Sequence, residues 1–313
     1  MNYYFAPLEG VTGYAFRRAH ARFFTPADKY FAPFISPTQN HRFSPRDLRE
    51  LCPENNEGVP TVPQLLCRNA EDFIWAADEL HAMGYGEVNL NLGCPSGTVS
   101  AKGKGAGFLA RLEELDRFLD TVYSAVRVPV SIKTRLGIVD PEEFGAILEI
   151  YNKYPVAELT IHPRVQKDFY KHPVRMDAFR MGYERAKPLV CYNGDLVRAA
   201  QAVEIAEAYP ALSAVMIGRG LVAKPNLLSP LKDGKPMDKA ALRAFHDELY
   251  ATYSQDFGSP KCAMLRMKEL WSYLRHMFAD SEAHIKRLNK SKLPEAYEAA
   301  VRDIFHDLDL SEH

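Results

Sequence analysis

Cysteine is scarce in this chain, and the few cysteines follow no regular spacing. There are five among 313 residues, and no two of them form a CxxC pair. An odd and irregular set excludes a disulfide scaffold and is not the pattern of a zinc site. We therefore expect a reducing compartment and no bound metal. Cys52, Cys67, Cys191 and Cys262 are predicted to be structural.

Long apolar runs and an excess of one charge are also missing. No stretch of 18 apolar residues occurs, so the sequence predicts no membrane-spanning helix. The first basic residue is Arg17, so the chain does not start like a signal peptide. Lys and Arg (39) nearly balance Asp and Glu (40), so a nucleic acid would need a local patch. Together these features predict a cytoplasmic globular protein.

Eight short apolar runs, rich in β-branched and aromatic residues, recur along the first 220 residues. They begin at Tyr3, Lys29, Thr61, Glu87, Pro129, Glu158, Pro188 and Ala214. The runs are continuous rather than alternating, which is typical of parallel strands buried on both faces. Helical patterns separate most of them, over Ala70–Met83, Glu113–Val126, Pro141–Tyr154 and Val197–Tyr209, and more weakly over Phe43–Cys52. Eight such alternations predict an α/β fold, a (β/α)8 TIM barrel.

A doubly wound open sheet is the alternative fold. It rarely needs eight strands, and no GxGxxG motif follows the first run. The glycine-rich stretch Gly97–Gly107 lacks the GK[ST] ending of a P-loop. Both absences favour the barrel.

The pattern changes after about Met237. No strand-like run follows, and Lys239–Leu308 has the pattern of amphipathic helices interrupted at Gly258–Pro260 and Pro294. We therefore predict a barrel domain over residues 1–238 and an all-helical domain over residues 239–313. Within the latter, Ser259–Lys292 carries a net charge of +5 and Leu293–His313 a net charge of −5. The helical domain is thus expected to have one basic face.

Polar, reactive or turn-forming residues follow seven of the eight runs, at the strand ends where the active site of such a barrel lies. These residues are Pro7, Glu9, Gln64, Asn91, Cys94, Lys133, Arg135, His162, Arg164, Asn193, Gly194, Asp195, Gly218 and Arg219. Strands with only a structural role would end in loops of unremarkable composition. The joint pattern therefore predicts an active site.

The last two runs end in glycine-containing turns. YNGD and IGRG place small residues and backbone N–H donors where such barrels commonly hold a phosphate, and Arg219 could bind it as well. Lys133 has two interpretations, a Schiff-base residue or a cation that holds an anion. Arg135 and Arg164 favour an anionic or electron-rich ligand.

Cys94 lies just after a predicted strand. Gly93 and Pro95 force a tight loop there, so the thiol should be partly exposed at the barrel mouth. With an ordinary pKa near 8.5, the thiol is mostly protonated at neutral pH and can donate a proton. A nucleophilic role would need a lowered pKa, and the sequence shows no adjacent base.

The strand-end motifs jointly resemble the flavin-dependent tRNA-dihydrouridine synthases. The matching segments occur in the family's order across about 220 residues, and they are APLEGVT, PQLL, NLNLGCPS, SIKTR, HxR, YNGD and MIGRG. KELWSYLRHMF and RLNKS resemble the family's C-terminal RNA-binding domain. HPRVQKDFY departs from the family's usual HGRTR, and SGTVSAKGKGAG replaces its double lysine. Lys102 and Lys104 are therefore either RNA contacts or solvated loop residues.

The resemblance implies a barrel that reduces the C5–C6 bond of a uridine in tRNA, in the D-loop by expectation. FMN would be the bound cofactor, and NADPH or NADH would reduce it transiently. Cys94 would protonate C5, and Asn91, Arg135 and Arg164 would face the uracil. FMN would be held by Pro7, Leu8, Glu9, Gln64, Lys133, His162, Asn193, Gly194, Asp195, Gly218 and Arg219. The resemblance implies no obligate protein partner, so we expect a monomer.

Other functions stay open on the sequence alone. A flavoenzyme of the same barrel type could act on a free pyrimidine or another small molecule, although such a substrate needs no basic helical domain. A barrel without flavin could be an aldolase or isomerase that uses Lys133. A catalytically silent RNA-binding module is opposed by the crowded strand ends, and ribosomal RNA is an alternative substrate.

Overall fold

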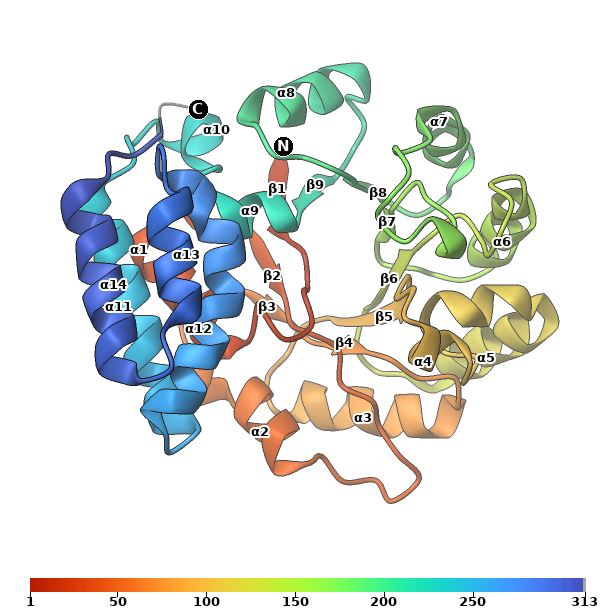
Figure 1. Ribbon diagram of the computed structural model, residues 1–313. Helices are drawn as coiled ribbons and strands as arrows, with labels where there is room; N and C mark the ends of the chain where they lie inside the picture. Colours follow the sequence, from red (N-terminus) through yellow and green to blue (C-terminus); the bar gives the residue numbers. More distant parts are fainter. Residues whose placement is uncertain (312–313) are drawn as a thin grey trace.

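The computed structural model describes residues 1–311, and a parallel sheet of nine strands closes into a barrel at its centre (Figure 1). The strands lie in the order β3-β2-β1-β9-β8-β7-β6-β5-β4. They are β1 Asn2–Phe5, β2 Lys29–Phe31, β3 Thr61–Val62, β4 Gln64–Leu65, β5 Val88–Leu92, β6 Val130–Thr134, β7 Leu159–Ile161, β8 Val190–Asn193 and β9 Ala214–Ile217. All eight predicted runs form strands, which confirms the predicted TIM barrel.

The ninth strand arises because the third predicted run is divided at Pro63. Thr61–Val62 pairs with β2 on one side, and Gln64–Leu65 pairs with β5 on the other. Proline has no N–H to donate, so the ladder is interrupted between the two halves. The two halves occupy the third of eight strand positions, and the divided strand is where the barrel closes.

Helices cover the outside of the barrel, and their starts follow local sequence signals. The predicted weak helix is α2 (Pro45–Leu51), which begins with a capping box between Ser44 and Asp47 and with proline at its first position. The other helices of this part are α1 Tyr14–Phe23, α3 Ala70–Ala82, α4 Gly97–Ser100, α5 Leu112–Ala125, α6 Glu143–Tyr151, α7 Met176–Arg185, α8 Ala199–Ala208, α9 Arg219–Ala223 and α10 Ser229–Lys232. All four helices expected between strands are present.

Side chains alternate between the inside and the outside of the barrel. Outward-facing residues such as Phe5 and Leu90 belong to a large core that they share with the surrounding helices. A smaller separate cluster fills one side of the interior and comprises Tyr4, Ala6, Phe31, Val62, Cys191, Ala214 and Met216. The other side, on β4 to β6, is polar and includes the buried side chains of Gln64, Asn89 and Ser131.

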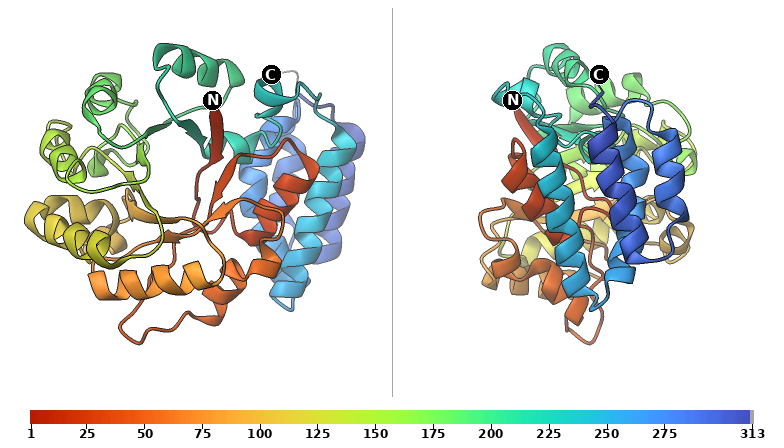
Figure 2. Two further views of the ribbon diagram at one scale, coloured as in Figure 1. Left: turned by 180° about the vertical axis from the view of Figure 1, so that it is seen from behind. Right: turned by 60° about the vertical axis from the view of Figure 1, so that its left-hand side comes forward.

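Four helices stack against one side of the barrel (Figures 1 and 2). They are α11 Lys239–Asp256, α12 Pro260–Leu274, α13 Glu282–Lys290 and α14 Pro294–Asp307. The predicted breaks are confirmed, because Pro260 and Pro294 are each the first residue of a helix. Helix α11 packs against α1 and α12, and α12 packs against α9. The division into two domains stays a prediction.

Among residues 1–311, no helix combines the length and the apolar character needed to cross a bilayer.

Candidate active site

A cavity of about 1020 Å³ lies where the strands end at their carboxyl termini. All of the predicted site residues except Arg164 line this cavity. The lining residues that were predicted are Pro7, Leu8, Glu9, Gln64, Asn91, Cys94, Lys133, Arg135, His162, Asn193, Gly194, Asp195, Gly218 and Arg219. Residues scattered over more than 200 positions thus meet in one place, because parallel strands of a barrel end at the same rim.

The Cys94 loop is held from below by the strand that precedes it. Asn91 Oδ1 accepts the backbone N–H groups of Gly93 at 3.0 Å and of Cys94 at 2.9 Å. Gly105 packs against the loop with φ of +57°, and a Cβ there would lie 2.9 Å from the Cys94 carbonyl oxygen. Burial raises the pKa of the Cys94 thiol above its ordinary value. The thiol is therefore protonated at neutral pH.

Arg135 joins the Cys94 loop to the loop after β7. Its Nε donates to the Gly93 carbonyl at 2.9 Å, and its Nη1 donates to the carbonyls of Val165 at 3.0 Å and Phe169 at 2.8 Å. Nη2 is buried and has no partner within the described residues. An unpaired buried donor is costly. Arg135 itself is among the residues that line the cavity.

Lys133 lies in β6, two residues before Arg135, which directly follows the strand. Burial, together with the charge of Arg135, lowers the pKa of Lys133 to about 8. The ammonium group thus titrates near physiological pH and holds its charge most firmly when an anion or an electronegative atom binds beside it. This property fits a ligand-holding cation and does not by itself exclude an amine nucleophile.

His162 is neutral, and its tautomer follows from one contact. Burial and the surrounding charges of Lys133, Arg135, Arg164 and Arg219 keep its pKa well below the ordinary value. Arg164 Nη1 lies 2.9 Å from His162 Nε2. Because a guanidinium group can only donate, Nε2 is the acceptor and Nδ1 carries the proton.

Arg164 is the one predicted site residue that the structure places behind the cavity wall. Its side chain is about 2% exposed, and it binds the Asp195 carboxylate through both Nη atoms. Asp195 also accepts from Arg219 Nη2 at 2.8 Å. Burial would raise the pKa of Asp195, but Arg164 and then Arg219 outweigh that effect and lower it. The carboxylate therefore stays ionised between the two arginines.

The turns after β8 and β9 approach each other closely. A Cβ on Gly220 would lie 2.1 Å from the Leu196 carbonyl oxygen, so only glycine fits there. The backbone N–H groups of Gly194 and Gly218 have no acceptor within residues 1–311, and both residues line the cavity. Together with Arg219 they form a donor set suited to a phosphate.

Several cavity residues were not predicted from the sequence. The Tyr170 ring is 52% exposed, with the Arg219 Cζ atom 4.7 Å and the Arg135 Cζ atom 5.2 Å from its centroid. Tyr170 belongs to the segment HPRVQKDFY, which departs from the family's usual HGRTR. This departure was the signal in the sequence that could have pointed to Tyr170. Tyr273 and His276, from α12 and the turn after it, also line the cavity. Nothing local marks these two, because they reach the cavity only through the packing of α12.

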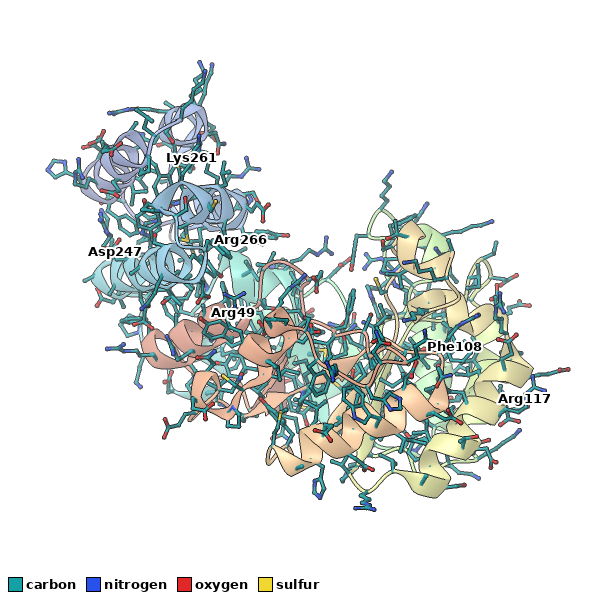
Figure 3. All side chains as sticks on the ribbon, turned by 90° about the horizontal axis from the view of Figure 1, so that it is seen from below. Arg49, Phe108, Arg117, Asp247, Lys261 and Arg266 are labelled. Atoms are coloured by element: carbon teal, nitrogen blue, oxygen red, sulfur yellow. The ribbon has the colours of Figure 1, made fainter. Side chains whose placement is uncertain are left out.

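Contacts near the cavity attach the helical region to the barrel. Arg266 of α12 donates to the carbonyl of Gly10, next to Glu9 of the cavity wall. The Tyr14 hydroxyl donates to the Asp256 carboxylate at 2.7 Å. A second cavity of about 170 Å³ lies at this junction, and Arg49 and Arg266 are among its lining residues (Figure 3). Helix α12 is thereby held in place as a wall of the active-site cavity.

Comparisons with known proteins agree with this arrangement. The sequence model of the family described as dihydrouridine synthase (Dus) matches residues 4–307. A probable tRNA-dihydrouridine synthase of Staphylococcus epidermidis is 27% identical over 300 residues, covering 94% of this chain and 90% of the relative. A probable tRNA-dihydrouridine synthase 2 of Bacillus subtilis is 26% identical over 297 residues, covering 93% and 90%.

The solved structures that resemble this chain share its fold at low sequence identity. Morphinone reductase in complex with tetrahydroNAD has a TM-score of 0.54 at 14% identity, covering 76% of this chain and 88% of that one. At this identity the likeness shows the fold alone. The family match, in contrast, spans nearly the whole sequence and includes both the barrel and the four following helices. The chain therefore belongs to the dihydrouridine synthase family.

Proposed function

We propose that this protein is a tRNA-dihydrouridine synthase that reduces the C5–C6 double bond of a uridine in tRNA. FMN is its bound cofactor, and NADPH or NADH is the reductant. One observation carries the proposal beyond family membership. The cavity is lined by Cys94, whose thiol is held in its protonated form, and by Arg135, whose buried Nη2 has no partner within residues 1–311.

The lining of the cavity fits FMN. The N–H groups of Gly194 and Gly218 and the Arg219 guanidinium are suited to the phosphate. Gln64, Lys133 and His162 offer polar atoms for the ring system, beside the apolar surface of Leu8 and Met216. The volume of about 1020 Å³ is at the upper end of ordinary ligand pockets, about 300–1,000 Å³, which supports a cofactor and a base together.

The residues of this chain supply the binding and the proton. When bound and reduced, FMN supplies the hydride that adds to C6. Cys94 transfers the proton of its S–H bond to C5, and a C–H bond forms as the S–H bond breaks. Arg135 and Lys133 lie close enough to lower the pKa of Cys94, so their charges stabilise the resulting thiolate. A proton from solvent then restores the thiol.

Further side chains can orient the uracil. Arg135 and Asn91 both line the cavity, so their N–H groups can donate to the uracil carbonyls. The half-exposed Tyr170 ring offers a stacking surface flanked by two guanidinium groups. Arg164, predicted from the sequence to face the uracil, is better assigned to holding Asp195 and His162.

An RNA substrate accounts for the wall contributed by α12. A uridine in folded RNA must leave its stack to enter such a cavity, at a cost of a few kcal/mol. Tyr273 and His276 line the cavity, where they can contact the nucleotide. The exposed lysines of α13, Lys286 and Lys290, lie on the same helical region and can hold phosphates outside the cavity.

The test is nucleoside analysis of tRNA from cells that lack this protein. We expect one or more dihydrouridines to be missing, and purified protein with NADPH should restore them in that tRNA. The purified protein should also be yellow, with a flavin spectrum. Reduction of free uracil or uridine without reduction of tRNA would instead support a small-molecule enzyme, and a colourless active protein would contradict the cofactor assignment.

A further inference from the structure

A chain of side-chain hydrogen bonds runs down the polar side of the barrel interior from the Cys94 loop. The Cys94 N–H donates to Asn91 Oδ1 at 2.9 Å. Asn91 Nδ2 donates to Gln64 Oε1 at 2.7 Å, and Gln64 Nε2 donates to Asn89 Oδ1 at 2.8 Å. These side chains come from β4 and β5, and all three amides are buried.

The chain continues to a carboxylate at the amino end of the barrel. Asn89 Nδ2 donates to Ser131 Oγ at 2.8 Å, and Ser131 Oγ donates to Glu87 Oε1 at 2.6 Å. Lys29 Nζ binds the other oxygen, Glu87 Oε2, at 2.6 Å. Asn89 and Ser131 are 0% and 1% exposed and do not line the cavity, so they have no route to a ligand.

The carboxylate determines the direction of every bond in the chain. An ionised Glu87 can only accept, so the Ser131 hydroxyl must donate to it and must accept from Asn89 through a lone pair. Asn89 therefore turns its amide nitrogen toward Ser131 and its oxygen toward Gln64. Since the Asn89 oxygen accepts, Gln64 must donate to it through its nitrogen and accept from Asn91 through its oxygen. The Asn91 nitrogen therefore points to Gln64, and the Asn91 oxygen faces the Cys94 loop.

The orientation of Asn91 matters for the site in two ways. Its oxygen accepts the N–H groups of Gly93 and Cys94, which holds the loop that carries the thiol. The amide nitrogen has a second hydrogen beyond the one given to Gln64, which leaves a donor for a ligand. A flipped amide would place a nitrogen against the Cys94 N–H, so that neither group would have an acceptor.

The barrel fold itself does not require this polar interior. The opposite side of the interior, on β8, β9, β1 and β2, is filled by apolar side chains such as Met216 and Phe31. Buried amides stabilise a fold less readily than apolar groups unless every donor and acceptor is paired. The polar chain is confined to the strands that carry or adjoin the Cys94 loop.

We propose that Glu87, Ser131 and Asn89 are positioning residues for the active site. Through the chain, they set the orientation of the Asn91 amide and so hold Cys94 in place, at the opposite end of β5 from Glu87. The role given to Cys94 rests on the proposed function, but the positioning of its loop does not.

The experiment measures the reactivity of the Cys94 thiol in protein without flavin or RNA. The variants are made in a Cys52→Ser/Cys262→Ser background, and alkylation of Cys94 by iodoacetamide is followed by peptide mass spectrometry across pH. Ser131→Ala breaks the chain in the middle. Ser213→Ala is the matched control, because Ser213 Oγ donates to a different carboxylate, Glu158 Oε1, also at 2.6 Å.

We expect Ser131→Ala to speed alkylation of Cys94 by about two- to tenfold, the range that corresponds to one net hydrogen bond. A looser loop exposes the thiol and relaxes the burial that raises its pKa, so both effects act in the same direction. Ser213→Ala should alkylate at the wild-type rate. Glu87→Gln keeps the shape of the side chain but can also donate, so the chain can reverse, and alkylation should again be faster.

Wild-type alkylation rates in both Ser131→Ala and Glu87→Gln would overturn the proposal. An equal increase in Ser213→Ala would also overturn it, because the effect would then be general loosening of the barrel. Because the assay uses neither FMN nor tRNA, its outcome is independent of the reaction. A protein that shows the expected alkylation pattern but never forms dihydrouridine would refute the proposed function and leave the positioning chain intact.

Discussion

Arg164 binds Asp195 through both arms of its guanidinium group, and Nη1 lies 3.0 Å from Oδ1. Asp195 adopts a left-handed backbone conformation with φ of +37°, which is uncommon for a residue other than glycine. Its carboxylate in turn binds Arg219, which lines the cavity. Buried Arg164 thus holds the Asp195 carboxylate in place, and Asp195 in turn orients the more exposed Arg219.

This relationship predicts unequal costs for removing the two arginines. Arg164→Met should lower the free energy of unfolding by about 1–3 kcal/mol, because it removes buried, charge-assisted bonds to Asp195 and the partner of His162. Arg219→Met should cost less than about 1 kcal/mol, since its side chain is 46% exposed. Urea unfolding of the ligand-free proteins measures both. Equal costs would show that the Arg164 pair is no stronger than a surface pair.

The phosphate assignment predicts that Arg219 affects cofactor binding more than stability. Arg219→Ala removes a charge-assisted contact of about 1.5–3 kcal/mol, so FMN should dissociate from the variant on extensive dialysis. The absorbance ratio of flavin to protein measures occupancy. Arg22→Ala is the control, because Arg22 pairs with Glu248 on the surface and does not line the cavity. An Arg219→Ala protein that stays fully yellow would place the phosphate elsewhere.

The role of Cys94 as acid predicts a defect confined to one half-reaction. Cys94→Ala should bind FMN and accept hydride from NADPH at the wild-type rate. Reduction of uridine in tRNA should fall by about 10²–10⁴-fold, the usual contribution of a general acid. Stopped-flow flavin spectra separate the two steps, and Cys262→Ala, which removes an exposed thiol, serves as the control. Equal slowing of both steps would mean that Cys94 supports the cofactor site instead.

The lowered pKa of Lys133 predicts that the stability of the ligand-free protein depends on pH. Its pKa is lowered from 10.5 to about 8, so between these values the unfolded chain binds more protons and Lys133 makes stability rise with pH. Lys133→Met should therefore stabilise the protein at pH 7, by up to about 3 kcal/mol, and this difference should vanish above about pH 10.5. Thermal unfolding across pH checks it, with exposed Lys187→Met as the control. A difference independent of pH would contradict the titration of Lys133.

The basic helical region predicts salt-dependent binding of tRNA. Its cations divide into two groups, because Arg287 binds Asp303 and Lys268 donates to backbone carbonyls, whereas Lys286 and Lys290 have no acidic partner within residues 1–311. Replacing Lys286, Arg287 and Lys290 together by Gln should weaken tRNA binding. The slope of log affinity against log salt concentration should become shallower by about 1 for each phosphate that the variant no longer binds.

Arg287→Gln alone is the control for that variant and should change the slope least, since its guanidinium is already engaged by Asp303. Filter binding of tRNA at several salt concentrations gives the slopes, and flavin content should be unchanged throughout. A triple variant that binds tRNA normally but melts earlier would assign this surface to stability and place the RNA elsewhere.

The sequence alone determined the barrel and most of its cavity lining. Each strand is a short apolar run that can be recognised locally, and parallel strands in a barrel must end at one rim. Polar residues that follow those runs, such as Gln64, Lys133 and Asn193, therefore had to meet, whatever the details of packing. The sequence also marked the starts of α12 and α14, because proline at these positions favours the first turn of a helix.

Only the tertiary structure decided which side chains pair within that set. Arg164 follows its strand just as His162 does, yet it turns behind the wall, where Asp195 happens to offer a carboxylate to both of its Nη atoms. Tyr273 and His276 reach the cavity because α12 packs on α9, through apolar burial between segments far apart in the sequence. The chain from Asn91 to Glu87 depends on the register of three neighbouring strands, which no local pattern records.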